Sequence, residues 1–435
     1  MLSSLFFYGW GEPRLLILML ISVIQGYVLG LLIEKFESKR LKKALLCLSL
    51  TISLGLLCVF KYLDFFLESI NHLTNFGLPL LRLALPIGIS FYTFQILSYT
   101  VDVYRGRVRA QRNFIDLAAY ITMFPQLIAG PIVRYSDIEK ALKSRSTSIE
   151  SLSLGARRFI FGLSKKILIA NVLGELIADF KASDDKSVLY FWLYAIAFTL
   201  HIYFDFSGYS DMAIGLGRIY GFDFLENFNY PYISKSITEF WRRWHISLGS
   251  WFRDYLYIPL GGNRVGPARH LFNILLVWLA TGLWHGAAWT FVLWGLLYAV
   301  LLIFEKFILK DRLKEHRIIS HIYTMFFVIL GFVLFDSDTV GSALECIKAM
   351  LLLGAQPLVS PSALYSLRSY FVVLIIAIIG STPLVNSIIK RLSSRSVRLE
   401  RAREASELIV LPLLLLLCTA FLADGSFNPF LYFRF

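Results

Sequence analysis

The sequence has few charged residues and lacks the phosphate-binding motifs of common nucleotide enzymes. Of 435 residues, 17% are charged and 57% are hydrophobic, whereas a soluble domain carries roughly 25% charged residues. No GxxxxGKS/T, GxGxxG, GxSxG or HExxH motif occurs, so ATP-driven transport, dinucleotide chemistry and zinc hydrolysis lose their usual sequence support. The four cysteines form no CxxC pair and have no histidine nearby at zinc-ligand spacing. We therefore expect neither a disulfide framework nor a metal site.

Long apolar runs dominate what remains, and many approach the ~20 residues that a helix needs to cross a bilayer. They are continuous and do not alternate with period two, which argues against a transmembrane barrel. We predict an all-α, polytopic membrane protein with roughly ten or eleven transmembrane or re-entrant helices. It is expected to form one integral-membrane domain over residues 1–435, with its core motifs in residues 80–305. Because no basic stretch precedes the first apolar run, that run is interpreted as a retained span and not as a cleaved signal peptide.

The formal net charge of +13 comes largely from short loops between apolar runs. Such loops mark the cytoplasmic face of a multi-pass protein, so the charge predicts membrane lipids as neighbours and no nucleic-acid partner. Basic residues flank residues 114–131 on both sides, which requires an even number of crossings or none. This segment contains "FPQLIAGP", in which Pro125, Gly130 and Pro131 break a helix. We expect a broken segment that lines a central cavity.

Basic residues also flank residues 270–307, so both ends of this apolar run are expected on the cytoplasmic side. The run must then form a hairpin whose turn falls near "GLWHGAAW", and His285 lies at its apex inside the membrane. An ionisable side chain at this depth is a functional candidate, and burial favours the uncharged imidazole, which can accept a proton.

The neighbours of His285 fit a substrate site. Gly286 leaves room for a long flexible substrate, and Trp284 and Trp289 offer flat walls. We predict His285 as a catalytic base and these three neighbours as substrate-binding residues. A core histidine bonded to a backbone carbonyl stays open as the alternative.

A second group surrounds His245 in "WRRWHISLGSWFRDY". Arg242, Arg243 and Arg253 suit an anionic group such as a phosphate near a cytosolic entrance. The alternative is a membrane-surface segment with tryptophans and snorkelling arginines. In "FDFSGYSDMAIG", the carboxylates of Asp205 and Asp211 need partners at membrane depth. They are candidates for orienting a histidine, pairing with arginine or marking the water boundary, and we include them among the substrate-binding predictions.

Four segments, "FPQLIAGPIVRY", "FDFSGYSDMAIGLGRIYGFDFLENFNYPY", "EFWRRWHISLGSWFRDYLYIPLGGNR" and "TGLWHGAAWTFVLWG", resemble the membrane-bound O-acyltransferase family. Within it they are most similar to the bacterial alginate O-acetylation branch, and the terminal "NPFLYFRF" is similar to that branch too. The branch that loads D-alanine onto teichoic acids is less similar. The resemblance implies a multi-helix fold around a central tunnel, with His285 as the catalytic histidine and His245 as the second histidine of the pattern.

The resemblance also implies the reaction. An acyl group, expected to be acetyl, moves from a cytosolic thioester donor, acetyl-coenzyme A or an acyl carrier, across a bacterial inner membrane. The acceptor is expected to be a polysaccharide such as alginate, reached with the help of an SGNH-hydrolase-like partner, and no cofactor is permanently bound. Two alternatives without chemistry stay open: a transporter or flippase of lipid-linked saccharides, and a structural scaffold for a cell-surface assembly.

Overall fold

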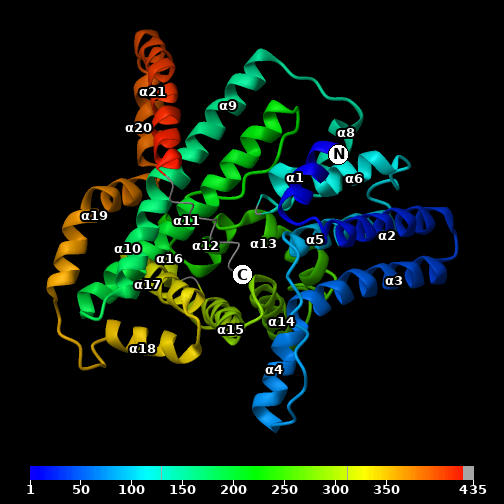
Figure 1. Ribbon diagram of the computed structural model, residues 1–435, viewed down its shortest axis with the longest axis horizontal. Coiled ribbons are helices and arrows are strands. Elements are labelled where there is room, and N and C mark those ends of the chain that lie inside the picture. Colours follow the sequence, from blue (N-terminus) through cyan, green and yellow to red (C-terminus); the bar gives the residue numbers. More distant parts are fainter. Residues whose placement is uncertain (129, 311, 425–435) are drawn as a thin grey trace.

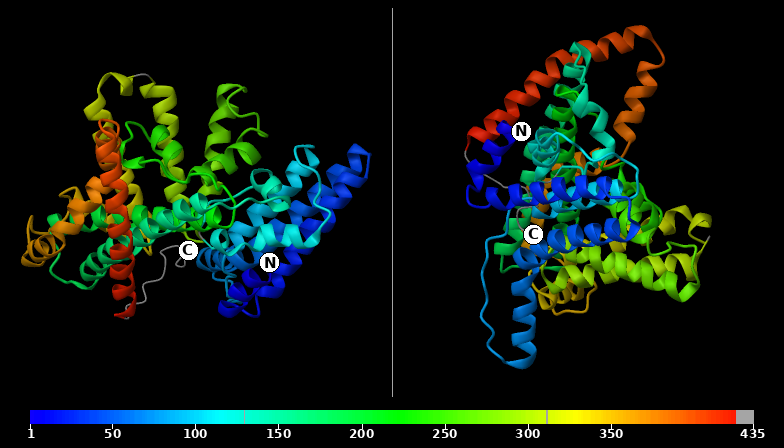
Figure 2. Two further views of the ribbon diagram at one scale, coloured as in Figure 1. Left: turned by 90° about the horizontal axis from the view of Figure 1, so that it is seen from above. Right: turned by 90° about the vertical axis from the view of Figure 1, so that its right-hand side faces the viewer.

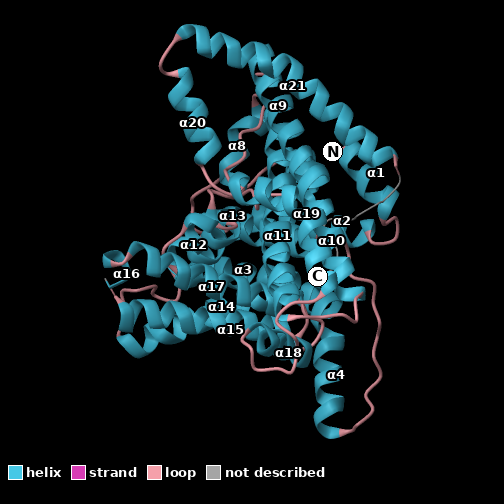
Figure 3. Ribbon diagram, turned by 90° about the vertical axis from the view of Figure 1, so that its left-hand side faces the viewer, coloured by secondary structure: helices cyan, strands magenta, loops and turns pink. Residues whose placement is uncertain are grey.

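The computed structural model describes residues 1–128, 130–310 and 312–424. All regular elements in these ranges are helical (Figure 3). The similarity seen in the last eight residues of the chain lies outside the described residues. The helices, including short π-helical and 3-10 turns labelled η, are α1 (Leu2–Gly11), α2 (Leu16–Lys35), α3 (Lys39–Leu57), η1 (Cys58–Tyr62), α4 (Leu63–Thr74), α5 (Ile89–Tyr104), α6 (Phe114–Thr122), α7 (Phe124–Leu127), α8 (Tyr135–Lys143), α9 (Ile149–Ser164), η2 (Lys165–Ala170), α10 (Asn171–Ala182), α11 (Val188–Ile219), η3 (Pro231–Ile233), α12 (Ile237–Arg243), α13 (Ile246–Phe252), η4 (Arg253–Tyr257), α14 (Pro267–His285), α15 (Trp289–Phe304), η5 (Glu305–Leu309), α16 (Arg312–Glu315), α17 (Arg317–Asp336), α18 (Val340–Met350), α19 (Pro361–Gly380), α20 (Leu384–Ser393) and α21 (Val397–Ala423).

Among the described residues, seven helical stretches are long and apolar enough to cross a membrane. They are Leu16–Lys35, Lys39–Thr74, Val188–Ile219, Trp289–Leu309, Arg317–Asp336, Pro361–Gly380 and Val397–Ala423. This confirms the all-α, multi-pass prediction. The total of ten or eleven spanning or re-entrant helices stays a prediction.

Helix α11 lies at the centre and packs along α9, η2 and α10 on one side and α17 on another (Figure 1). Glycines let the backbones of α9 and α11 touch: a Cβ built on Gly162 would lie 2.6 Å from the Gly208 carbonyl oxygen. Helices α2, α3 and α5 form a separate group at the N-terminal side, and Figure 2 shows the same separation from two other directions. The core between these groups holds the functional candidates.

Two structural predictions are confirmed. The segment 114–131 is broken, because α6 ends at Thr122 and a short α7 begins at Phe124. The run 270–307 is a hairpin of α14 and α15 with its turn directly after His285.

Three boundaries expected from the sequence differ from the structure. The apolar run over residues 78–104 predicts one span, but α5 begins only at Ile89, after two prolines and the left-handed Gly88. The semi-polar stretch after Phe206 predicts amphipathic and buried pieces, but α11 continues to Ile219, with Asp211 paired to cations of the neighbouring helices. The run over residues 370–389 predicts a span, but the helix there, α19, begins at Pro361 and ends at Gly380.

Candidate active site

The hairpin of α14 and α15 is closed by contact between backbones. A Cβ on Gly282 would overlap the backbone of Phe291, and one on Gly295 would overlap the carbonyl of Trp278. At the turn, a Cβ on Gly286 would overlap the Phe291 ring. The glycines of this segment are therefore explained by packing of the hairpin itself, which places the residue before Gly286, His285, at the end of α14.

The His285 ring is enclosed by aromatic side chains. Ring centroids lie 5.0 Å from Trp284, 5.0 Å from Trp294 and 5.3 Å from Phe335, which belongs to α17. The residue is 6% exposed, and both ring nitrogens are buried without a hydrogen-bond partner among the described residues. The alternative of a histidine bonded to a backbone carbonyl therefore does not describe this ring. A buried polar atom without a partner is costly, and such atoms gather where a ligand or a reaction needs them.

The structure brings His245 to the same place. Its ring centroid lies 5.9 Å from that of Trp284, so both histidines contact the same tryptophan. His245 is the N-cap residue of α13 and has a left-handed conformation with φ of 44°, which costs a non-glycine residue about 1–2 kcal/mol. Strain of this kind concentrates at functional sites.

Asn227 fixes the orientation of His245. The Oδ1 atom of Asn227 accepts hydrogen bonds from the backbone N–H of Ser247 at 3.2 Å and from the Ser247 hydroxyl at 2.9 Å. Because the backbone N–H can only donate, the shared acceptor is the amide oxygen. The Nδ1 atom of His245, 3.1 Å from this oxygen, must then carry the proton. Its Nε2 is left with a lone pair, and this atom is buried without a partner among the described residues. Burial lowers the pKa of His245 to about 3, so the ring is neutral.

Further unpartnered donors continue from His285 along α15. Trp294 contacts Tyr298 with ring centroids 5.1 Å apart, and Trp241 from α12 lies 5.4 Å from Trp294 and 4.9 Å from Tyr298. The indole N–H groups and the tyrosine hydroxyl are buried and have no partner among the described residues. Tyr298 lies closer than Trp294 to the end of α15 that the charge pattern assigns to the cytoplasm. These donors form a row between that end and His285.

The other predicted site residues lie elsewhere. Trp289 is 54% exposed and directs its indole N–H to the Ser69 hydroxyl on α4, 3.3 Å away, so it forms no wall at the imidazole. Trp294 occupies that place instead. Asp205 is paired with Lys166 at 2.5 Å, and Asp211 with Lys165 at 2.6 Å and Arg158 at 2.8 Å. Pairing with arginine, one of the three alternatives considered for these carboxylates, is what the structure shows for Asp211, whereas Asp205 pairs with a lysine.

The predicted arginines are only partly brought together. Arg242 is exposed, and Arg243 pairs with Glu239 on its own helix at 2.9 Å. Arg253 pairs with Asp254, which also binds Arg134 at 2.8 Å. Burial raises the pKa of Asp254, but the hydrogen bonds from Arg253 and Arg134 outweigh this effect and hold that pKa below its usual value. The carboxylate is therefore ionised.

Around this pair lies a basic cluster of which the sequence identifies only Arg253. Arg105 and Arg134 lie over the Tyr255 ring, 5.4 and 5.2 Å from its centroid, and the Tyr255 hydroxyl donates to Asp102. Arg107 pairs with Asp102 at 3.5 Å. The cluster of Arg105, Arg107, Arg134 and Arg253 thus has four cations against the two carboxylates of Asp102 and Asp254. Its members come from three segments distant in sequence, so no local pattern could have identified it.

A membrane-crossing chain whose described residues form helices, with two buried histidines and a row of unpartnered donors in its core, has the organisation of a membrane-embedded enzyme. The model of the membrane-bound O-acyltransferase family matches residues 28–336, and the chain belongs to this family. It is an acyltransferase. The multi-pass membrane location follows from the same match and from the apolar helices.

Relatives of known name extend this assignment. The probable alginate O-acetylase AlgI of Azotobacter vinelandii is 38% identical, with 100% of this chain and 93% of the relative covered. The peptidoglycan O-acetyltransferase of Helicobacter pylori is 36% identical, with 80% and 72% covered. The teichoic acid D-alanyltransferase of Bacillus subtilis is 32% identical, with 58% and 68% covered. This chain is thus more similar to the two O-acetylating relatives than to the D-alanylating one.

Proposed function

We propose that this protein moves an acetyl group from a cytosolic thioester across the inner membrane for O-acetylation of a cell-surface polysaccharide such as alginate, with His285 as general base. The observation that carries this proposal is the His285 imidazole, whose two buried nitrogens have no partner among the described residues. The greater similarity to relatives named O-acetylases favours acetyl over D-alanyl as the transferred group.

The donor is acetyl-coenzyme A, which binds from the cytoplasmic side. Its phosphates meet the basic cluster around Tyr255, where arginines outnumber carboxylates and offer planar, multidentate contacts. The pantetheine arm then passes the row formed by Tyr298, Trp241 and Trp294. Their unpartnered donors suit the amide and thioester carbonyls of that arm.

The reaction needs one base and a positioned thioester. A neutral His285 nitrogen takes the proton of the acceptor hydroxyl, the oxygen attacks the thioester carbonyl, and the C–S bond breaks to release coenzyme A as thiolate, which then takes up a proton. His245, with its lone pair on Nε2, accepts a hydrogen bond from one of the substrates. General-base catalysis contributes roughly 10²–10⁴-fold, so positioning of the two substrates supplies much of the remaining acceleration.

Both ring nitrogens of His285 are buried in this structure, so the surrounding aromatic side chains must move when substrates enter. A tunnel that reaches the ring stays a prediction. On the far side of the membrane, an SGNH-hydrolase-like partner receives the acetyl group or presents the acceptor. The polysaccharide then remains outside the membrane while the donor remains inside.

The test is mass spectrometry of surface polysaccharides from cells that lack the protein, complemented with either the wild type or His285→Ala. We expect the acetyl mass increment of 42 Da to be present with the wild type and absent with the variant, at equal levels of both proteins in the membrane. Movement of an unmodified saccharide, with no such mass difference, would instead indicate a flippase. Full acetylation by His285→Ala would refute the base assignment.

A further inference from the structure

The last carbonyl groups of α14 are all bonded, although a helix end normally leaves four of them without an intrahelical partner. The Gly282 carbonyl accepts from the backbone N–H of Gly286 at 3.3 Å. The next three carbonyls, of Leu283, Trp284 and His285, accept from side chains of another segment. Two consecutive residues, Lys61 and Tyr62, supply all of these donors.

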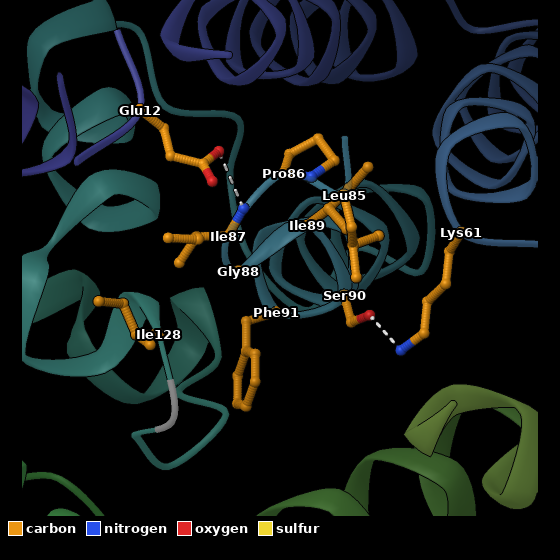
Figure 4. A pocket seen from close by; sticks show the side chains of 10 residues that line it. All are labelled: Glu12, Lys61, Leu85, Pro86, Ile87, Gly88, Ile89, Ser90, Phe91 and Ile128. Atoms are coloured by element: carbon orange, nitrogen blue, oxygen red, sulfur yellow. Dashed lines mark hydrogen bonds between the residues drawn. The ribbon is translucent and has the colours of Figure 1, made fainter. Parts of the chain in front are cut away.

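The contacts are specific in geometry. The Tyr62 hydroxyl donates to the Leu283 carbonyl at 2.7 Å, and the Lys61 ammonium donates to the Trp284 carbonyl at 2.6 Å and lies 3.4 Å from that of His285. The third direction of the ammonium is taken by the Ser90 hydroxyl at 3.3 Å, in the first turn of α5. Figure 4 shows the Lys61 side chain extended toward Ser90. Its three hydrogens are thus all used within the protein.

The segment that carries these residues is unusual. Lys61 and Tyr62 lie in η1, a π-helical turn between α3 and α4, and such turns occur frequently at functional sites. A lysine within the membrane is costly and needs partners. The last carbonyl groups of α14 provide them. The structure therefore places a buried amino group directly on the backbone of the proposed base.

We propose that Lys61 is a positioning residue for His285: with Tyr62 it clamps the end of α14 and so sets where the imidazole stands. The proposal rests on the proposed role of His285. The contact of Lys61 is with the backbone carbonyl of that residue, so the role proposed for it is positioning. Without the clamp, the last turn of α14 has a free ammonium-sized gap beside it and unbonded carbonyls. A shift of about 1 Å in a reacting group costs on the order of 10²-fold in rate.

The kinetic test uses purified full-length protein in liposomes, with labelled acetyl-coenzyme A as the donor probe. We expect Lys61→Met, which keeps the length and loses the charge, to lower kcat by about 10–10²-fold while KM for acetyl-coenzyme A changes less than about twofold. Lys43→Met, the same substitution at an exposed position of α3, is the matched control and should behave as wild type. An unchanged kcat in Lys61→Met would overturn the proposal.

A rescue experiment separates positioning from simple loss of stability. Lys61 lines a cavity of about 290 Å³ together with Glu12, Ser90 and Phe91 (Figure 4), so a small amine can reach the space left by Lys61→Ala. Ethylamine should raise the kcat of Lys61→Ala at least about tenfold. It should leave the kcat of Lys61→Met unchanged, because the methionine side chain fills the space. Equal responses of the two variants would contradict the clamp.

A second measurement does not depend on catalysis. Hydrogen exchange of the backbone amides in residues 283–287, followed by mass spectrometry, should accelerate at least about tenfold in Lys61→Met and stay unchanged in Lys43→Met. If wild-type protein transfers no label, the proposed function fails, but this exchange still decides whether Lys61 holds the end of α14. Unchanged exchange in Lys61→Met would overturn the clamp even if the transferase assignment stood.

Discussion

Two buried polar regions of this protein follow opposite rules. Along the α9–α11 interface, charged groups meet charged partners: Asp205 with Lys166, and Asp211 with Lys165 and Arg158. Around the α14–α15 hairpin, the nitrogens of His285 and the Nε2 of His245 have no partner among the described residues. Satisfied polar groups hold helices together, whereas unsatisfied ones are available to a substrate.

The largest expected effect on activity comes from the region whose buried nitrogens have no partner among the described residues. His285→Ala should lower acetyl transfer by roughly 10²–10⁴-fold, because it removes the base, while the thermal midpoint in detergent stays close to wild type. His316→Ala, at an exposed histidine before α17, is the control. Transfer assays on liposomes with labelled acetyl-coenzyme A measure both. A midpoint that collapses along with activity would show that His285 belongs to the structural group.

Changes to the paired charges of the first region should lower the stability of the protein and leave its catalytic activity unchanged. Lys166→Met leaves the Asp205 carboxylate buried beside an apolar group, which costs about 3–5 kcal/mol, and the yield of folded protein should fall. The double variant Lys166→Met/Asp205→Asn removes both charges and should recover much of that yield. Activity per folded molecule is expected within about threefold of wild type in both proteins. A low kcat in a well-folded double variant would instead place Asp205 in the chemical group, where the sequence first suggested it.

Asn227 combines features of both regions. Its own side chain is hydrogen-bonded, and it orients His245, whose Nε2 has no partner among the described residues. Asn227→Ala removes the acceptor that fixes the His245 tautomer and should lower kcat roughly 10-fold. Ser210→Ala removes only the hydroxyl to which the Asn227 amide donates and should have a smaller effect. Comparison of kcat and KM at constant pH measures both variants. Equal, wild-type kinetics would show that His245 needs no orientation.

The smallest effect is expected at Trp289. Its ring lies 5.4 Å from Phe65 of α4 and does not face the imidazole. Trp289→Phe should leave transfer within about twofold of wild type and change the free energy of unfolding by less than about 0.5 kcal/mol. The matched change at a buried position, Trp294→Phe, should be distinctly more harmful, because Trp294 packs on His285. Thermal unfolding and the transfer assay compare the two variants.

The sequence predicted the hairpin and the broken segment because both depend on local signals. Basic flanks set which ends lie on the same side, and Pro125 and the glycines mark where helices cannot continue. The same reasoning placed His285 at a turn. It failed for α11, where the semi-polar sequence after Phe206 predicted amphipathic and buried pieces. The stretch is helical to Ile219, and its Asp211 pairs with Lys165 from another helix, a contact that no local pattern shows.

The missed site residues share a physical reason. Lys61 is 224 residues from His285, and Asn227 is 18 residues from His245. Nothing near either residue in the chain shows what it will bind. Trp294 and Trp289 are both tryptophans close to His285, and only the rotation of α15 decides which of them faces it. The resemblance to the family identified the two histidines as site residues. The contacts in the structure identified Lys61, Asn227 and Trp294.

The glycine contact between α14 and α15 limits how the enzyme can admit its substrates. Since Gly282 and Gly295 already bring the two backbones together, that pair of helices has no slack to open or slide. Access to the imidazole then depends on the rings that enclose it: Phe335 on α17, and Trp284 and Trp294 on the hairpin itself. A bulkier residue at Gly282 or Gly295 would push the two helices apart and displace His285 from the aromatic rings around it.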